Sequence, residues 1–227
     1  MSALTIITPA AQGEIRYPET DGQPMAETDI HRDERLALIH ALMEWYRNDA
    51  QVYVAGNLLL YYKEGNPRAS VAPDGFVVLG VAKQQRRIYK LWEEGRAPSV
   101  VFELTSESTQ DDDLERKRLL YEKLGVGEYF LFDPTQDYLN PKLQGFRLQG
   151  RYYSPLAPQS RPDGEWQLIS QTLSLELHTA GTRLRMFDPR AGEYLRSPRE
   201  EAEARREAEA ELARARAELA RLRGEAP

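Results

Sequence analysis

The 227-residue sequence contains no cysteine and only three histidines, His31, His40 and His178. Without cysteine the chain can form neither disulfides nor zinc–thiolate sites, and a cysteine nucleophile is excluded. Three scattered histidines also argue against a histidine-rich metal site. A bound metal ion is therefore expected on carboxylate oxygens, a ligand type that suits Mg²⁺ or Mn²⁺.

Long apolar stretches are also missing from the sequence. No segment approaches the roughly 18 uninterrupted apolar residues of a membrane span, and no basic region precedes the short apolar run near the N-terminus, as it would in a signal peptide. We therefore expect no membrane partner and, by default, a cytoplasmic location. The net charge of −6 argues against broad, charge-driven binding to nucleic acid, but it leaves room for a local basic groove.

Composition divides the chain into three segments. Residues 1–28 are polar and interrupted by proline and glycine, which predicts a short extended segment. Residues 29–197 alternate between helix and strand patterns and are expected to form the main domain. Residues 198–227 consist mostly of Glu, Ala, Arg and Leu, which predicts a long charged helix.

The main domain is expected to begin with a helix near Asp29, because Thr28 or Asp29 can cap it. Residues 51–66 follow, with β-branched and aromatic side chains on both sides of Gly56-Asn57, which indicates a hairpin or a strand–turn–strand segment. Three- and four-residue spacing predicts that the apolar face of the helix contains Leu36, Ile39, Leu42, Met43 and Tyr46.

Residues 99–133 contain the most regular pattern in the chain. The apolar run SVVFELT at 99–105 is typical of a strand buried on both faces. Three aspartates at 111–113 suit the start of a helix and Gly125 suits its end. EYFLFD at 128–133 reads as a second strand, so the segment predicts a βαβ unit with a right-handed crossover.

Further strand patterns surround this unit, at 74–82, 145–156 and 173–188. The last two are typical of hairpins. Together these elements predict an α/β (α+β) fold, with a central mixed β-sheet flanked by helices and a charged helix at the C-terminus.

Two carboxylates occupy unusual places in these strands. Asp74 stands where its strand begins, and Glu103 lies inside the apolar run VVFEL. A charge among apolar strand residues is costly unless it is paired, metal-bound or lifted out at a strand end. If the two strands are neighbours, the carboxylates converge and can bind a hard divalent cation.

A lysine beside such a pair could orient a water molecule or stabilise developing negative charge. Position 105, two residues after Glu103, holds threonine, so the nearest candidate is Lys117 on the following helix. Asp113 lies one turn earlier and can pair with Lys117, and Tyr121 extends the same ridge by another turn.

Four motifs in order resemble the Uma-two family, which belongs to the PD-(D/E)xK superfamily of restriction-endonuclease-like nucleases. They are APD at 72–74, VFELTSEST at 101–109, D-x-x-x-K-x-x-x-Y at 113–121 and GVGEYFLFDP at 125–134. The resemblance extends from about Pro18 to Pro189. It implies a restriction-endonuclease-like core and a metal-dependent DNA endonuclease that uses Mg²⁺ or Mn²⁺ and has DNA as its substrate.

The resemblance also assigns roles to individual residues. It implies that Asp74 and Glu103 are catalytic carboxylates that bind the metal, with the backbone carbonyl of Leu104 as an additional ligand. Lys117 would stand in for the motif lysine, moved from the strand to the helix, since Thr105 occupies the usual position. His31 matches a position where the family often carries a polar residue near the cleft.

A second interpretation stays open beside the enzyme. The same fold could lack catalysis and act as a binding or assembly module that recruits partners through its C-terminal helix. The acidic net charge and the missing strand lysine favour this alternative, whereas the presence of both Asp74 and Glu103 favours the nuclease.

The C-terminal helix itself carries a thin apolar stripe of Leu212, Leu219 and Leu222, with alanines between them. This spacing is a modest coiled-coil pattern. It predicts a homo-oligomer such as a dimer, or a partner helix, while a solvated single helix remains the simplest alternative.

Overall fold

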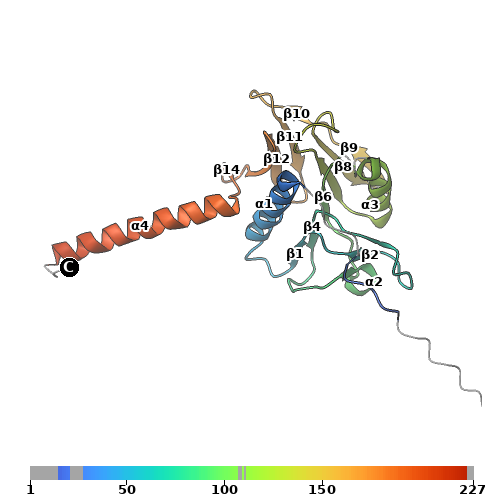
Figure 1. The fold of residues 1–227 in the computed structure, drawn as a ribbon, viewed down its shortest axis with the longest axis horizontal. Helices are drawn as coiled ribbons and strands as arrows, with labels where there is room; N and C mark the ends of the chain where they lie inside the picture. Colours follow the sequence, from blue (N-terminus) through green and yellow to red (C-terminus); the bar gives the residue numbers. More distant parts are fainter. Residues whose placement is uncertain (1–14, 21–27, 107–108, 110, 224–227) are drawn as a thin grey trace, which may run out of the picture.

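The computed structural model describes residues 15–20, 28–106, 109 and 111–223, and Figure 1 shows its fold. A six-stranded sheet lies at the centre, in the order β1 (Val52–Ala55), β4 (Gly75–Leu79), β6 (Val100–Leu104), β7 (Glu128–Phe132), β8 (Leu143–Gln149) and β9 (Tyr152–Pro155). β6 and β7 run parallel, and the other neighbours in this sheet are antiparallel. The prediction of a central mixed sheet is therefore confirmed.

Two smaller sheets accompany the central one. A five-stranded antiparallel sheet follows it in the chain, with β10 (Gln159–Ser160), β11 (Trp166–Ser170), β12 (Leu175–Ala180), β13 (Arg183–Asp188) and β14 (Glu193–Tyr194). A three-stranded sheet contains β3 (Ser70–Val71), β2 (Leu60–Tyr61) and β5 (Tyr89–Lys90). The helices are α1 (Asp29–Trp45), α2 (Leu91–Glu94), the π-helical segment η1 (Asp112–Lys117), α3 (Arg118–Leu124) and α4 (Pro198–Leu222).

Each face of the central sheet has its own hydrophobic core. α1 and the five-stranded sheet pack on one face, where Phe102 and Leu104 of β6 point. α3 and the three-stranded sheet cover the other face, where Val101 of β6 points. Because side chains alternate along a strand, Glu103 must point to the same side as Val101, towards the helix that connects β6 to β7.

The connection from β6 to β7 confirms the predicted βαβ unit. Its helix begins as η1, continues as α3 and ends at Gly125, whose φ of 81° lies in the left-handed region. Glycine adopts this conformation without the steric cost that other residues meet. The first six residues are π-helical, a local widening that is frequent at functional sites.

The buried face of α1 agrees with the prediction at Leu42 but not at Leu36 and Met43. Thr28 caps the helix as expected, with its side chain accepting a hydrogen bond from His31 N. The residues in the core are Leu38 and Leu42, whereas Leu36 and Met43 are about half exposed, at 56% and 49%. The polar residue Glu34 explains the rotation, since its buried carboxylate accepts a hydrogen bond from Leu184 N at 2.6 Å and turns that side of α1 towards β13.

Residues 51–66 contain the predicted strand–turn–strand segment, but its two strands do not form a hairpin. β1 pairs with β4, and β2 belongs to the three-stranded sheet. The chain turns out of the central sheet at Gly56, where a Cβ atom would collide with the carbonyl of Asp74 and with Ile39. Asn57 N then donates a hydrogen bond to Pro73 O at 2.8 Å, which ties this crossing to the start of β4.

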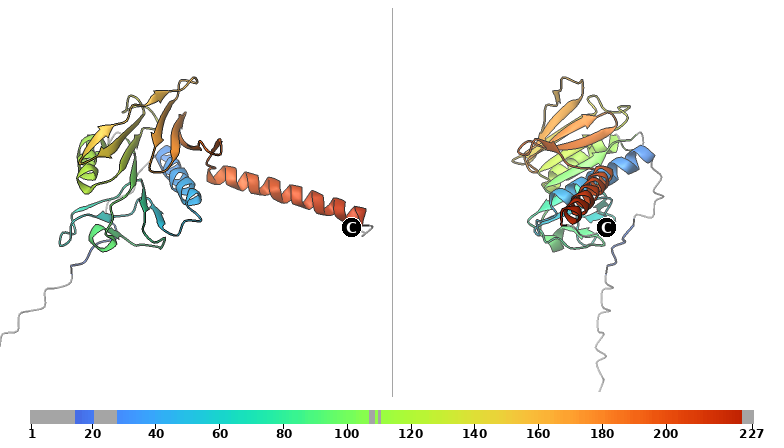
Figure 2. Two further views of the ribbon diagram at one scale, coloured as in Figure 1. Left: turned by 180° about the vertical axis from the view of Figure 1, so that it is seen from behind. Right: turned by 90° about the vertical axis from the view of Figure 1, so that its left-hand side faces the viewer.

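The C-terminal helix α4 projects away from the body of the protein, as Figure 2 shows from two sides. It starts with a capping box, in which the side chain of Ser197 accepts from Glu200 N and the side chain of Glu200 accepts from Ser197 N. Pro198 is the first residue of the helix. Arg185 Nη1 lies 3.0 Å from Glu200 Oε1 and links the helix to β13. None of the residues Pro198–Leu222 is buried.

Most of the predicted N-terminal extended segment lies outside the described residues, since 1–14 and 21–27 are not among them. Residues 15–18 have no regular secondary structure, and Pro18 O accepts a hydrogen bond from Tyr61 Oη at 2.7 Å. Among the residues that the structure describes, no helix is long and apolar enough to cross a membrane.

Candidate active site

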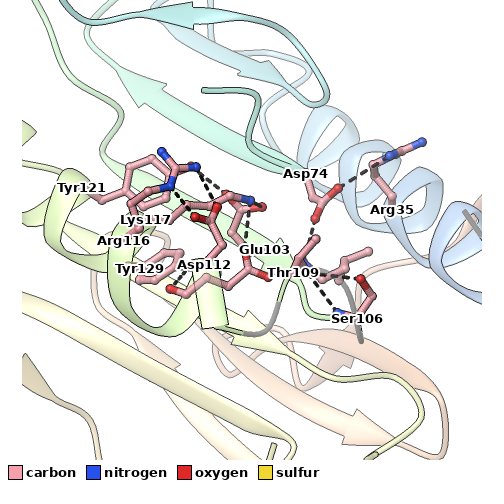
Figure 3. Close-up of polar contacts among 12 residues, drawn as sticks. Arg35, Asp74, Glu103, Ser106, Thr109, Asp112, Arg116, Lys117, Tyr121 and Tyr129 are labelled. Carbon is pink, nitrogen blue, oxygen red and sulfur yellow. Dashed lines mark hydrogen bonds and ion pairs between the residues drawn. The ribbon is translucent and has the colours of Figure 1, made fainter. Parts of the chain in front are cut away.

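Asp74 directly precedes β4, and Glu103 lies near the end of β6, the antiparallel neighbour of β4. The two strands pair with Gly75 facing Phe102, so Asp74 and Glu103 both adjoin this last pair of the ladder. The convergence expected from the sequence is therefore present, and Figure 3 shows Asp74 beside the end of β6.

Leu104 lies directly at this pair of acids. Its backbone N–H donates a hydrogen bond to Asp74 Oδ2 at 2.8 Å. In an extended strand the N–H and C=O of one residue point to the same side, so the carbonyl of Leu104 is also directed towards Asp74. Two carboxylates and one carbonyl thus gather at the end of β6.

Glu103 is almost completely buried, with 1% of its side chain exposed. Tyr121 Oη donates a hydrogen bond to Glu103 Oε1 at 2.6 Å, and Lys117 Nζ lies 2.9 Å from Glu103 Oε2. Both partners come from the helix that follows β6 in the chain. Figure 3 shows this arrangement, with Lys117 and Tyr121 directed from the helix towards Glu103.

Lys117 bridges two acids. Its Nζ atom is 2.8 Å from Asp113 Oδ1 in addition to its contact with Glu103. The pairing of Asp113 with Lys117 that their spacing predicts is thus present. Asp113 is held in turn at its backbone, where its carbonyl accepts a hydrogen bond from Tyr129 Oη at 3.0 Å.

Burial and the neighbouring charges shift the pKa values of this cluster. Burial raises the pKa of Glu103 to about 8; Lys117 opposes the rise, and Asp74 and Asp113 add to it. Burial also lowers the pKa of Lys117, but Glu103 and Asp113 outweigh it and the net shift is upward, so the lysine stays protonated. Burial, followed by the charge of Glu103, raises the pKa of Tyr121 well above its ordinary value, which keeps its hydroxyl a donor.

His31 joins α1 to the same end of β6. Its Nε2 atom is 3.0 Å from Thr105 O, and its Nδ1 atom is 2.7 Å from Thr28 Oγ1. Thr105 N donates to Phe132 O at 2.8 Å, so both the N–H and the C=O of Thr105 are held. The structure therefore places His31 against the backbone at the site.

Two residues at the site were missed from the sequence. Arg35 Nη1 lies 3.6 Å from Asp74 Oδ1, and Arg35 follows His31 by one helical turn, a spacing that puts both on one face of α1. Tyr129 supports Asp113 from β7. A tyrosine inside an apolar strand is itself a signal, since a buried hydroxyl needs a hydrogen-bond partner.

The donor atoms at this site fit a hard divalent cation. Mg²⁺ is usually bound through one or two carboxylates, with water and substrate phosphate completing its ligands. Asp74, Glu103 and the carbonyl of Leu104 supply oxygen atoms of these kinds. Within the described ranges, no group of three or more His, Cys, Asp or Glu residues could hold a metal ion, so a cation here would depend on this smaller set and on water.

The chain is similar to known proteins in two of three comparisons. No curated protein matches it. It is similar to a solved structure described as "a putative nuclease belonging to DUF820 from Anabaena variabilis ATCC 29413", with 15% identity and a TM-score of 0.45 over 66% of this chain and 86% of the other. The model of the Uma2 family, described as "Putative restriction endonuclease", matches residues 7–182. That match spans more than half of the chain, and the protein therefore belongs to the Uma2 family.

Proposed function

We propose that this protein is a metal-dependent DNA endonuclease that hydrolyses phosphodiester bonds at the site of Asp74, Glu103 and Lys117. The position of Lys117 carries the proposal. Thr105 leaves the strand without a lysine, but the helix brings the Lys117 ammonium group to 2.9 Å from Glu103. Membership of a family described as "Putative restriction endonuclease" supports the nuclease class.

Asp74, Glu103 and the carbonyl of Leu104 would hold Mg²⁺ or Mn²⁺. A divalent ion of this kind lowers the pKa of bound water and neutralises charge on a phosphodiester. Tyr121 fixes the orientation of Glu103 by donating to Oε1. Leu104 N fixes Asp74 in the same way at Oδ2, so both carboxylates are preorganised before any ligand arrives.

Lys117 supplies the positive charge at the reacting phosphate. Its pairing with Asp113 and Glu103 keeps it protonated and limits its side chain to one position. A fixed cation in a largely buried site stabilises the negative charge that develops on the phosphate oxygens, or orients the attacking water, more strongly than it would in open solvent.

Plasmid and oligonucleotide cleavage with Mg²⁺ or Mn²⁺ tests this function. We expect the wild-type protein to cut DNA, EDTA to stop the reaction, and Asp74→Asn and Glu103→Gln to lose it. Asp112→Asn is the matched control, because Asp112 lies on the same helix and its carboxylate accepts a hydrogen bond from Arg116. Cleavage that survives both site substitutions would overturn the site assignment.

A second candidate is a nuclease-fold module that binds or assembles partners without catalysis. The exposure of α4 favours it, since a 25-residue helix without a single buried residue offers a large surface for contact. Absence of cleavage with every divalent ion and DNA substrate, in a protein that folds normally, would favour this module over the enzyme.

A further inference from the structure

Helix α4 carries a regular apolar seam, which consists of Ala208, Leu212, Ala215, Leu219 and Leu222. Successive members are alternately four and three residues apart. Its leucines are strongly exposed, with 51% of Leu212, 52% of Leu219 and 72% of Leu222 accessible to solvent. Figures 1 and 2 show why, since α4 extends away from the described body and nothing there covers the seam.

The spacing of the seam is that of a coiled coil. Apolar residues that alternate at four and three positions repeat every seven residues and form one narrow stripe along a helix. In this heptad Leu212 and Leu219 occupy the a positions, while Ala208, Ala215 and Leu222 occupy the d positions. A stripe this narrow is suited to one partner helix rather than to a broad globular surface.

Charged residues flank the seam in an ordered way. The g positions on one side hold Glu211 and Glu218, and the e positions on the other side hold Glu209 followed by Arg216 and Arg223. In a parallel pair of helices, a g residue faces the e residue five positions later on the partner. Glu211 would therefore face Arg216 of the partner subunit, and Glu218 would face Arg223 of the partner subunit.

An antiparallel pair of the same helices would be less complementary in charge. In that orientation each a position packs against a d position of the partner, g positions face g positions and e positions face e positions. With Leu212 against Ala215 of the partner subunit, Glu211 would face Glu218 of the partner subunit, and only Arg216 would meet an opposite charge, on Glu209 of the partner subunit. Charge complementarity thus favours a parallel arrangement of identical helices.

We infer that the partner of α4 is a second copy of this chain, and that the two helices form a parallel, two-stranded coiled coil over Ala208–Leu222. Both bodies then lie at the same end of the assembly. The seam stops before the body, because the preceding core positions hold Glu201 and Arg205. These charged turns act as a spacer between the coiled coil and β13, to which Glu200 is linked.

The absence of cysteine from the wild-type chain allows a direct test of orientation. In the full-length protein, Ala208→Cys places one thiol in the seam near its beginning. In a parallel pair this residue faces its own copy, whereas in an antiparallel pair it would face Leu219 of the partner subunit. We expect oxidation to convert Ala208→Cys into a covalent dimer on a non-reducing gel. Ala217→Cys, on the outer face of the same helix, is the control. Its thiols face away from each other, so it should run as a single chain on the same gel.

Sedimentation of the full-length protein tests the seam independently. We expect the wild type at twice the chain mass of 26.0 kDa and the double variant Leu212→Glu, Leu219→Glu at the monomer mass. The matched control is Ala210→Glu, Ala217→Glu, which adds the same charge on the outer face and should stay dimeric. Circular dichroism should show that the body folds equally in all of them.

Exchange of the flanking charges completes the test. Glu211→Arg with Glu218→Arg should dissociate the dimer, and adding Arg216→Glu with Arg223→Glu should restore it. A monomeric wild type, a mass above two chains, or cross-linking of Ala208→Cys only to a Leu219→Cys chain would overturn the inference. None of these measurements depends on DNA cleavage, so their failure would leave the proposed function untouched.

Discussion

Two buried glutamates on neighbouring strands differ in how the protein surrounds them. Glu103 on β6 and Glu128 on β7 are each 1% exposed, and both strands belong to the parallel pair at the centre of the sheet. Glu128 is surrounded by donors alone: Arg147 Nε at 2.8 Å, Ser170 Oγ at 2.5 Å, Gln171 N at 3.1 Å and Thr172 N at 3.3 Å. It joins the central sheet to the end of β11.

Glu103 has a different environment at the opposite end of the strand pair. Its donors are Tyr121 and Lys117, and it shares the lysine with Asp113. Asp74 lies at the start of the neighbouring strand β4. A buried carboxylate whose oxygens all accept hydrogen bonds stabilises the fold. A buried carboxylate close to other acids lowers the stability of the fold, but the same negative charges favour the binding of a cation. The comparison separates a structural acid from one suited to chemistry.

The largest expected effect is on cleavage by Glu103→Gln. We expect kcat/KM to fall by about 10³-fold or more, equivalent to about 4 kcal/mol of transition-state stabilisation. The melting temperature should stay the same or rise, because the Gln side chain still accepts a hydrogen bond from Tyr121 and Lys117 retains its ion pair with Asp113. Cleavage kinetics and calorimetry on the same preparation check both parts, and a marked fall in melting temperature would contradict the comparison.

The converse change, Glu128→Ala, should act on stability. It leaves Arg147 and the surrounding donors without their acceptor, which should lower the free energy of unfolding by about 3 kcal/mol. Urea denaturation measures this loss, and Glu128→Gln is a milder control because it keeps one acceptor oxygen. At a temperature where the variant is folded, cleavage should be close to wild type, and a selective loss of cleavage would show that Glu128 also serves the site.

A smaller effect is expected from Lys117→Met. Loss of the fixed cation should reduce cleavage by about 10²-fold, while Mg²⁺ should bind at least as tightly, because Glu103 and Asp113 no longer share a positive charge. Titration calorimetry measures Mg²⁺ binding and single-turnover experiments measure cleavage, so the two effects can be separated. Lys123→Met removes an exposed lysine from the same helix and should leave both unchanged, and weaker Mg²⁺ binding in Lys117→Met would reject this role.

The last prediction is a pH dependence of stability in the metal-free protein. The pKa of Glu103 is raised from 4.5 to about 8, so the folded state binds this proton more tightly than the unfolded state. The resulting stabilisation is complete below about pH 4.5 and is lost as the pH rises to about 8. Between these values the melting temperature of Glu103→Gln should rise relative to wild type, and above about pH 8 the difference should level off.

Asp112→Asn is the control for this titration. Its hydrogen bond with Arg116 lowers the pKa of Asp112 below 3.8, so its proton is lost before the window in which Glu103 titrates. The difference in melting temperature between Asp112→Asn and wild type should therefore stay flat from about pH 5 to 8. A flat difference for Glu103→Gln as well would show that Glu103 is already ionised at pH 5.

Local patterns in the sequence determined the βαβ unit and the residues of the site. The apolar runs of β6 and β7, the aspartates at the start of the connecting helix and Gly125 at its end are all signals within a few residues of one another. Glu103 stood out because a charge in a buried strand needs a reason, and the four-residue spacing from Asp113 through Lys117 to Tyr121 put all three on one side of the helix. The cap of α1 at Thr28 was readable for the same reason.

Only the tertiary structure decided how distant segments meet at that unit. The rotation of α1 depends on Glu34 contacting Leu184 N, and the partner of β1 depends on how closely the chain passes Asp74 at Gly56. The contacts of His31 with Thr105 and of Arg35 with Asp74 join α1 to the site across tens of residues. Side-chain periodicity reports which face of an element is buried, but which partner satisfies a buried polar group depends on packing between elements, and that information appears only once the chain has folded.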